Sequence, residues 1–213
     1  MPDDFSKDLL PTHGEAIDPV EMARRDQRKA LPKRFYETAG VDERDGLFVL
    51  VLDGRPALTP ARALIALPTR AAAEAVADEW NAQDDEIDPA KMPMTRLVNS
   101  ALDGVTRQRA ATAAEIVKFA GSDLVCYRAG EPHSLVIEQA RAWNPVLDFV
   151  REKLGARFVL AEGVVFAAQP AEAVAAVAAA VEAAAAGPGG VFRLAALHLL
   201  TRLPGSALLA LAV

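Results

Sequence analysis

Two short segments of this chain combine adaptable or aromatic side chains with arginine, a combination that suits contact with another protein. Met92, Met94 and Arg96 lie at the start of a predicted helix, where flexible thioethers fit irregular surfaces and arginine is enriched at interfaces. Tyr127 and Arg128 follow another predicted helix. We interpret these five residues as candidate partner-binding residues. Structural roles stay open, because Met94 also fits an apolar stripe and the Tyr127 hydroxyl could anchor a loop.

Residue types that catalyse reactions or bind metals do not form a recognisable constellation. His13, His133 and His198 lie far apart, lack metal-ligand spacing and have no cysteine pair beside them. The single cysteine, Cys126, could form a dyad with a histidine in the fold, although we favour a buried structural role. The sequence contains no phosphate-loop, GxGxxG, HExxH or GxSxG motif. We therefore expect no catalytic residue, cofactor, metal site or small-molecule substrate.

The acidic run from Asp84 to Asp88 has the composition of a calcium-binding loop but not its spacing. If the loop begins at Asp84, Pro89 takes the position where the sharp turn needs glycine. Thr95 then takes the position where a glutamate should bind the ion. We therefore expect a solvated acidic loop.

Composition and charge exclude several classes of protein. With 213 residues the chain can bury a core without disulfides, and its net charge of −6 and 6% aromatic content argue against nucleic-acid binding. The acid-rich N-terminus resembles neither a secretory signal nor a transit peptide. The alanine-rich stretch 171–186 contains two glutamates and is too short to span a membrane. We expect a cytoplasmic protein with no stable membrane insertion.

Strand patterns precede helix patterns along the chain, which predicts an α+β fold. An apolar run at 46–52 leads into Asp53-Gly54, a strong hairpin signal, and Pro56 places the returning strand at a sheet edge. Another short strand is expected at 63–67, and short extended pieces are expected at 157–160 and 164–166. Apolar residues then recur at helical spacing, and Trp80 and Trp143 lie on apolar stripes, so we expect both in the core. The predicted helices span 69–83, 93–105, 107–120, 134–154, 170–186 and 192–203, with a kink or break at Pro145.

This order predicts three regions: a flexible arm at 1–32, a small antiparallel β-containing domain at 33–92 and an all-helical domain at 93–213. Residues 1–22 carry six acids and one lysine, whereas 23–34 carry six bases and one acid. The arm could instead be a docking segment, and its basic stretch leaves a small RNA-binding protein as an alternative.

A series of short motifs follows one another through the rest of the chain. In order, they are Arg34-Phe35-Tyr36, Leu52-Asp53-Gly54-Arg55-Pro56, Thr59-Pro60, Leu67-Pro68-Thr69, Glu79-Trp80, Gln83, Ile87-Asp88-Pro89, Met92-Pro93-Met94-Thr95-Arg96, Asp123-Leu124-Val125-Cys126-Tyr127-Arg128, Gln139, Trp143-Asn144-Pro145 and Gln169. The ordered set resembles the assembly-chaperone family of the F-type ATP synthase catalytic head, in the branch that handles the alpha subunit. The resemblance covers about residues 33 to 213.

The resemblance implies a bacterial molecular chaperone, because the mitochondrial relatives carry a transit peptide. It implies a small β-containing domain followed by a helical domain. It also implies a non-catalytic role, in which the protein holds unassembled alpha subunit until beta subunit replaces it. An enzyme with an unrecognised site, acting on a small molecule or a nucleotide, is the alternative.

The end of the chain departs from this family. Family members continue into a further acidic helical segment, so we expect a truncation after Val213. The apolar sequence from Ser206 to Val213 should be mostly docked, with its last turn exposed and prone to self-association.

Overall fold

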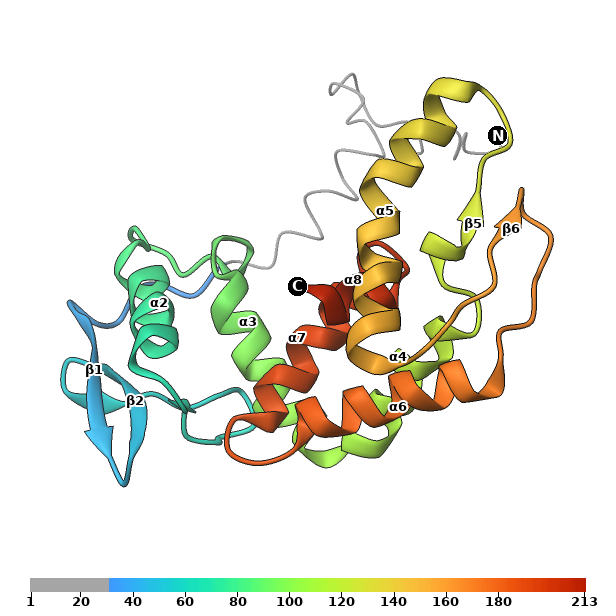
Figure 1. Ribbon diagram of the computed structural model, residues 1–213. Helices are drawn as coiled ribbons and strands as arrows, with labels where there is room; N and C mark the ends of the chain where they lie inside the picture. The colour runs from blue at the N-terminus through green and yellow to red at the C-terminus, as the bar shows by residue number, and fades with distance from the viewer. Residues whose placement is uncertain (1–30) are drawn as a thin grey trace, which may run out of the picture.

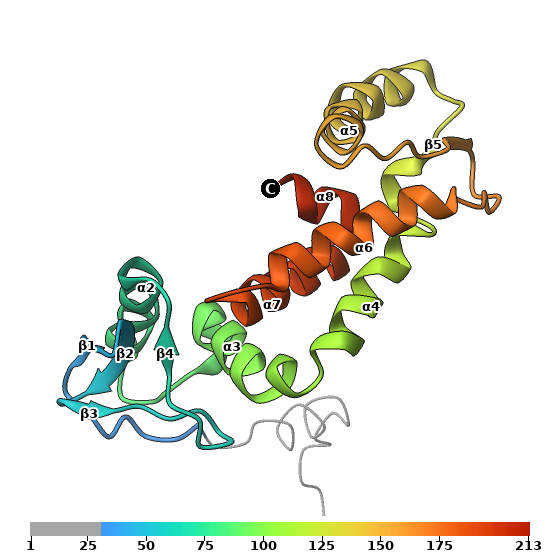
Figure 2. The ribbon, with the colours of Figure 1, turned by 60° about the horizontal axis from the view of Figure 1, so that its bottom comes forward.

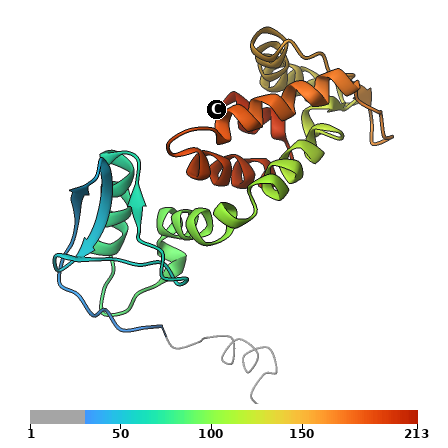
Figure 3. The same ribbon diagram turned by 90° about the horizontal axis from the view of Figure 1, so that it is seen from below.

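The computed structural model describes residues 31–213, and Figure 1 shows a β-containing part followed by a helical part. This arrangement confirms the predicted α+β fold class. The expectation of an arm at 1–32 falls almost entirely outside the described residues. Figure 3 shows the two parts side by side, with helix α3 (Pro93–Asn99) between them.

The β-containing part is an antiparallel sheet organised around one central strand. Strand β2 (Leu47–Leu52) pairs with β1 (Ala39–Arg44) along one edge. Along its other edge it pairs with β3 (Arg55–Pro56) at one end and with β4 (Ala66–Leu67) at the other. The edge position expected for the strand containing Pro56 is therefore confirmed.

Two Asp-Gly turns set the register of this sheet. Asp53 and Gly54 have φ angles of 47° and 74°, which is the backbone that a type I′ hairpin turn requires. Asp45 and Gly46 have φ angles of 51° and 74° and form the β1–β2 hairpin in the same way. The sequence carries the same dipeptide at both places, yet strand β1 was not expected at 39–44.

Helix α2 (Arg70–Asn81) covers one face of the sheet (Figure 3). Its N-terminus is capped by the Thr69 hydroxyl, which accepts a hydrogen bond from the backbone N–H of Ala72. Its buried face packs on the inward side chains of β2 and β4. The shared core contains Leu50, Leu52, Ile65, Leu67, Ala73 and Val76.

A carboxylate of α2 fixes the start of α3. The backbone N–H groups of Met94 and Thr95 donate to the Glu79 carboxylate over 2.6 and 2.7 Å. These N–H groups lack partners within α3, so Glu79 satisfies them and stabilises the positive end of the helix dipole. The expected helix at 93–105 begins at Pro93 as predicted, but after Asn99 it continues as a π-helical turn and then a 3₁₀ turn.

The helical part is built around its last and shortest helix. Helix α8 is apolar on all sides and contacts four other helices (Figure 2). An all-apolar helix must be covered by protein, and Ala207 and Leu208 are fully buried while Val213 is 97% exposed. The docking expected for this segment is therefore confirmed. The helices are α4 (Arg109–Ala120), α5 (His133–Leu154), α6 (Ala171–Ala185), α7 (Gly190–Arg202) and α8 (Ala207–Ala212).

A buried carboxylate anchors the start of α8. Asp123 has no exposed surface, and its Oδ2 accepts a hydrogen bond from the backbone N–H of Leu208 over 3.0 Å. Its Oδ1 accepts a second from Val125, which caps the turn Leu124–Cys126. Burial raises the pKa of the Asp123 carboxyl, and the hydrogen bonds from Ser206 and these backbone groups act against that rise.

Residues 127–166 differ from the expected pattern in two places. A kink or a break was expected at Pro145, and helix α5 has no break there, although its axis bends along its length (Figure 1). The extended pieces expected at 157–160 and 164–166 are not strands. Instead, β6 (Ala161–Glu162) lies between them and pairs in parallel with β5 (Tyr127–Arg128).

Asp123→Ala should lower the free energy of unfolding by about 2–4 kcal/mol, because several buried donors at the start of α8 lose their acceptor. Urea denaturation of both proteins measures the difference. Asp148→Ala is the control, since Asp148 pairs with Arg151 on the surface and should cost less than about 1 kcal/mol. Equal stabilities of wild type and Asp123→Ala would contradict the anchoring role.

Asp53 should make stability depend on pH. Hydrogen bonds from the backbone N–H groups of Thr38 and Glu37 hold the pKa of this carboxyl below its usual range. The stabilisation is present above the unfolded-state pKa of about 3.9 and is lost as pH falls through the lower folded value. Asp53→Asn keeps a residue that suits the turn, so its stability should fall less between pH 5 and pH 2.

Chemical denaturation across this pH range checks the expectation. Asp45→Asn is the matched control, since it changes the other Asp-Gly turn without touching the Thr38 and Glu37 hydrogen bonds. If Asp53→Asn loses stability with acid as steeply as wild type, the Asp53 cluster does not account for it.

Candidate partner-binding surfaces

The structure places the first group of predicted partner-binding residues at the join between the two parts. Met92 is only 2% exposed and belongs to the core of the β-containing part, so it offers no free surface to a partner. Met94 is half-buried and packs against the same core. Arg96 is exposed on α3. Of these three residues, only Arg96 is accessible in full.

The second group has mainly structural contacts. Arg128 is half-buried and donates hydrogen bonds to the carbonyl oxygens of Val125 and Gln139 over 2.8 and 3.2 Å. Its guanidinium lies over the Trp143 ring, 5.3 Å from the centroid. Tyr127 packs against the helical core. These contacts join β5 to α5, and a role for Tyr127 and Arg128 in partner binding stays a prediction.

The residues considered for catalysis lie apart. Burial, together with the nearby Asp123 charge, raises the pKa of the Cys126 thiol to about 12, which keeps it protonated at neutral pH. His133 is exposed at the start of α5, and His198 lies on α7. Within residues 31–213, no three His, Cys, Asp or Glu side chains form a group able to hold a metal ion. No helix in this range is long and apolar enough to cross a membrane.

Both tryptophans were expected in the core, and the structure corrects this expectation. Trp80 and Trp143 are half-buried. Each packs at the edge of one hydrophobic cluster, Trp80 in the β-containing part and Trp143 in the helical part. Their large rings cover the core from outside, and truncating Trp143 should therefore cost less than the loss of a fully buried tryptophan.

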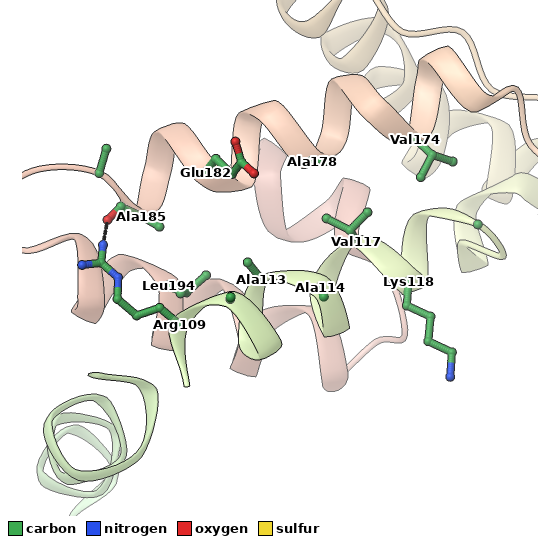
Figure 4. Close-up of a pocket in the computed structure, with 13 residues that line it drawn as sticks. Arg109, Ala113, Ala114, Val117, Lys118, Val174, Ala178, Glu182, Ala185 and Leu194 are labelled. Carbon is green, nitrogen blue, oxygen red and sulfur yellow. Dashed lines mark hydrogen bonds between the residues drawn. The ribbon is translucent and has the colours of Figure 1, made fainter. Parts of the chain in front are cut away.

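A groove lies between α4 and α6 (Figure 4). It encloses about 650 Å³ and has a largely apolar surface. Six of its 13 lining residues are alanine, so a helix placed there could approach closely. Charged groups occur mainly near its ends. Its lining includes Ala110, Ala113, Ala114, Val117, Val174 and Ala178, with Arg109, Lys118 and Glu182 as charged members.

Two arginines hold the walls of this α4–α6 groove together. Arg109 of α4 donates to the carbonyl oxygen of Ala185 at the end of α6, as the dashed line in Figure 4 shows. Arg193 of α7 donates to the carbonyl oxygens of Ala184 and Pro188. The last carbonyls of a helix lack partners within it and attract cations. The arginines therefore fix the C-terminal end of α6 relative to α4 and α7.

A second apolar surface is the loop that follows β6. Val164 is 95% exposed and Phe166 is 68% exposed, which is unusual for neighbouring large apolar side chains. The base of the loop is closed by the Gln169 amide, which both accepts from the N–H of Val159 and donates to its carbonyl oxygen. The loop therefore presents apolar side chains from a fixed base.

Sequence reasoning did not identify either of these surfaces. The groove needs α4 and α6 side by side, although 50 residues separate them in the chain. Alanine-rich helices gave no sign of which face stays open. The run Val164-Val165-Phe166 is visible in the sequence, but there it predicts only a short extended piece.

Solved structures of bacterial proteins resemble this fold. Atp12 from Paracoccus denitrificans is 39% identical over 85% of this chain and 76% of its own, with a TM-score of 0.76. A mutant of the same protein matches equally well. Atu1473 from Agrobacterium tumefaciens, described as a candidate chaperone, is 45% identical over 92% of this chain and 72% of its own, with a TM-score of 0.78.

The family assignment follows from the sequence itself as well as from these structures. The matched region begins with the β-containing part and includes α2, α3, α4 and most of α5. A family model described as the ATP12 chaperone protein matches residues 33–151, more than half of the chain, and the protein therefore belongs to the ATP12 chaperone family.

Proposed function

We propose that this protein is a cytoplasmic assembly chaperone that binds the unassembled alpha subunit of the bacterial F-type ATP synthase and releases it to beta subunit. Membership of the ATP12 chaperone family supports the chaperone role. The choice of alpha subunit rests on the resemblance of the ordered motifs to the branch that handles it. Beta subunit is the natural comparison in every test.

The observation that carries the proposal is the apolar α4–α6 groove. A subunit that will enter an obligate ring has large apolar interfaces, which aggregate while they are bare. A groove lined by alanine and valine can cover such a surface by accepting a helix lengthwise. Its few charged groups leave the contact dominated by apolar burial, and its modest volume limits the area covered. Binding of this kind can be displaced by the larger, permanent partner.

A nucleotide-dependent enzyme is the second candidate function. Calorimetric titration with ATP and Mg²⁺ separates the two functions. Heat of binding with a defined stoichiometry would favour a nucleotide-dependent enzyme, whereas the chaperone requires none. The Cys126 thiol is protonated at neutral pH, which argues against its use as a nucleophile.

The protein should suppress aggregation of isolated alpha subunit in the absence of ATP. Light scattering of denatured alpha subunit, diluted into buffer with and without one equivalent of the protein, measures the effect. Beta subunit diluted in the same way should aggregate as it does alone. Equal scattering of alpha subunit with and without the protein would overturn the proposed function.

Ala114→Arg should weaken alpha-subunit binding about tenfold or more, because a charged side chain would be buried in the occupied groove. Ala111→Arg is the matched control, since Ala111 is exposed on the same helix but does not line the groove. Both changes are on the surface, so thermal stability should stay close to wild type. Equal binding by the two variants would place the contact outside this groove.

A further inference from the structure

A second groove lies on another face of the helical part, where α3 meets α7. It encloses about 500 Å³ and is lined by residues of α3, the turn after it and the C-terminal half of α7. Leu97, Val105 and Ala195 give it an apolar floor. Unlike the α4–α6 groove, it lies next to the β-containing part, because the first N–H groups of α3 are hydrogen-bonded to Glu79 of α2.

The charge of this α3–α7 groove is opposite to that of the whole chain. Arg96 and Arg202 line it, and no acidic residue is among its lining residues, although the protein carries a net charge of −6. Neither arginine forms an ion pair within the described part of the chain. His198 also lines the groove, and its Nε2 lies 3.0 Å from a carboxylate oxygen of Glu115 on α4.

Apolar side chains at the rim complete the pattern. Leu203 is 75% exposed and Leu199 is 46% exposed, and both line the groove beside Arg202. Guanidinium groups pair with carboxylates in two-point geometry, and neighbouring leucines accept apolar side chains. A ligand with phosphate alone would leave these leucines uncovered. A helix with one apolar and one acidic face would satisfy both.

We propose that the α3–α7 groove binds an acidic amphipathic helix of the client subunit. The client as the source of this helix rests on the proposed chaperone function. The α7 residues that line the groove run from Ala195 to Arg202, about 10 Å at about 1.5 Å per residue, so a bound helix contacts α7 over about two turns. Arg96 then acts in partner recognition together with Arg202, while the α4–α6 groove holds an apolar part of the client.

A labelled model peptide tests the chemistry of the groove. The probe is a synthetic 15-residue helix with leucine on one face and glutamate on its flanks, and its counterpart carries lysine in place of every glutamate. Fluorescence anisotropy at low salt should detect binding of the acidic peptide and at least tenfold weaker binding of the basic one. Raising the salt concentration to about 0.5 M should weaken acidic-peptide binding, since these charges are at the surface. Equal affinity for both peptides would overturn the charge argument.

Variants of the full chain locate the site. Arg96→Gln combined with Arg202→Gln should lower acidic-peptide affinity at least tenfold and remove most of its salt dependence. Arg107→Gln is the control, because Arg107 is exposed nearby and does not line the groove. It should bind the peptide as wild type does. The assignment would be overturned if the Arg107→Gln control also lost peptide binding. It would be overturned equally if the double variant bound the peptide as wild type does.

Binding of alpha subunit by the same variants tests this inference separately from the chaperone function. The double variant should bind alpha subunit several-fold more weakly than wild type while the Arg107→Gln protein does not change. If wild type protects alpha subunit and the double variant protects it equally, the groove is not a client site although the function stands. A last variant lacks the acidic residues 1–22. If this deletion raises peptide affinity several-fold, residues 1–22 compete for the groove. That result would overturn the proposal that a client helix is the natural ligand of the groove.

Discussion

The helical part depends on one buried carboxylate at the start of its central helix. Removing the Asp123 carboxylate from water is unfavourable, and no lysine or arginine pairs with it in the contacts described. Donors from Val125, Ser206 and Leu208 compensate by converging on its two oxygens. Because Ser206 and Leu208 begin α8, this interaction fixes the helix on which α4, α5, α6 and α7 pack. The α4–α6 groove is therefore a consequence of where α8 is anchored.

A second carboxylate connects this helical part to the sheet. Glu79 lies on α2, which packs on the sheet, and it accepts hydrogen bonds from the first free N–H groups of α3. Asp103, in the π-helical turn after α3, accepts a hydrogen bond from the Thr59 hydroxyl over 2.6 Å and another from the N–H of Ala61. Both ends of this segment are thus fixed to the β-containing part. The α3–α7 groove takes its orientation from these contacts.

Several side chains of the motifs that identify the family form hydrogen bonds to backbone groups elsewhere in the chain. Arg34 donates to the carbonyl oxygens of Tyr36 and Glu37, and Gln83 bridges Glu79 and Asp88. Gln139 and Gln169 hold β5 and the loop after β6 in the same manner. Such roles need a particular side chain at a particular position, whereas an apolar contact surface accepts many residues. Recognition from the sequence therefore reached the family and its fold, but of its five candidates for binding only Arg96 is exposed.

Local signals in the sequence determined the elements and their ends. Asp53-Gly54, Thr69, Pro93 and Gly155 act within one turn of the chain, and each has the backbone conformation or cap that its type predicts. The all-apolar end of the chain likewise required a covered helix. Tertiary structure alone decided which apolar faces remain exposed. The sequence pattern of an alanine or leucine stripe is the same whether or not another helix covers it. Tertiary structure also decided that Met92 is buried while Arg96 faces a groove with Arg202, because α7 reaches α3 only through packing across about 100 residues of chain.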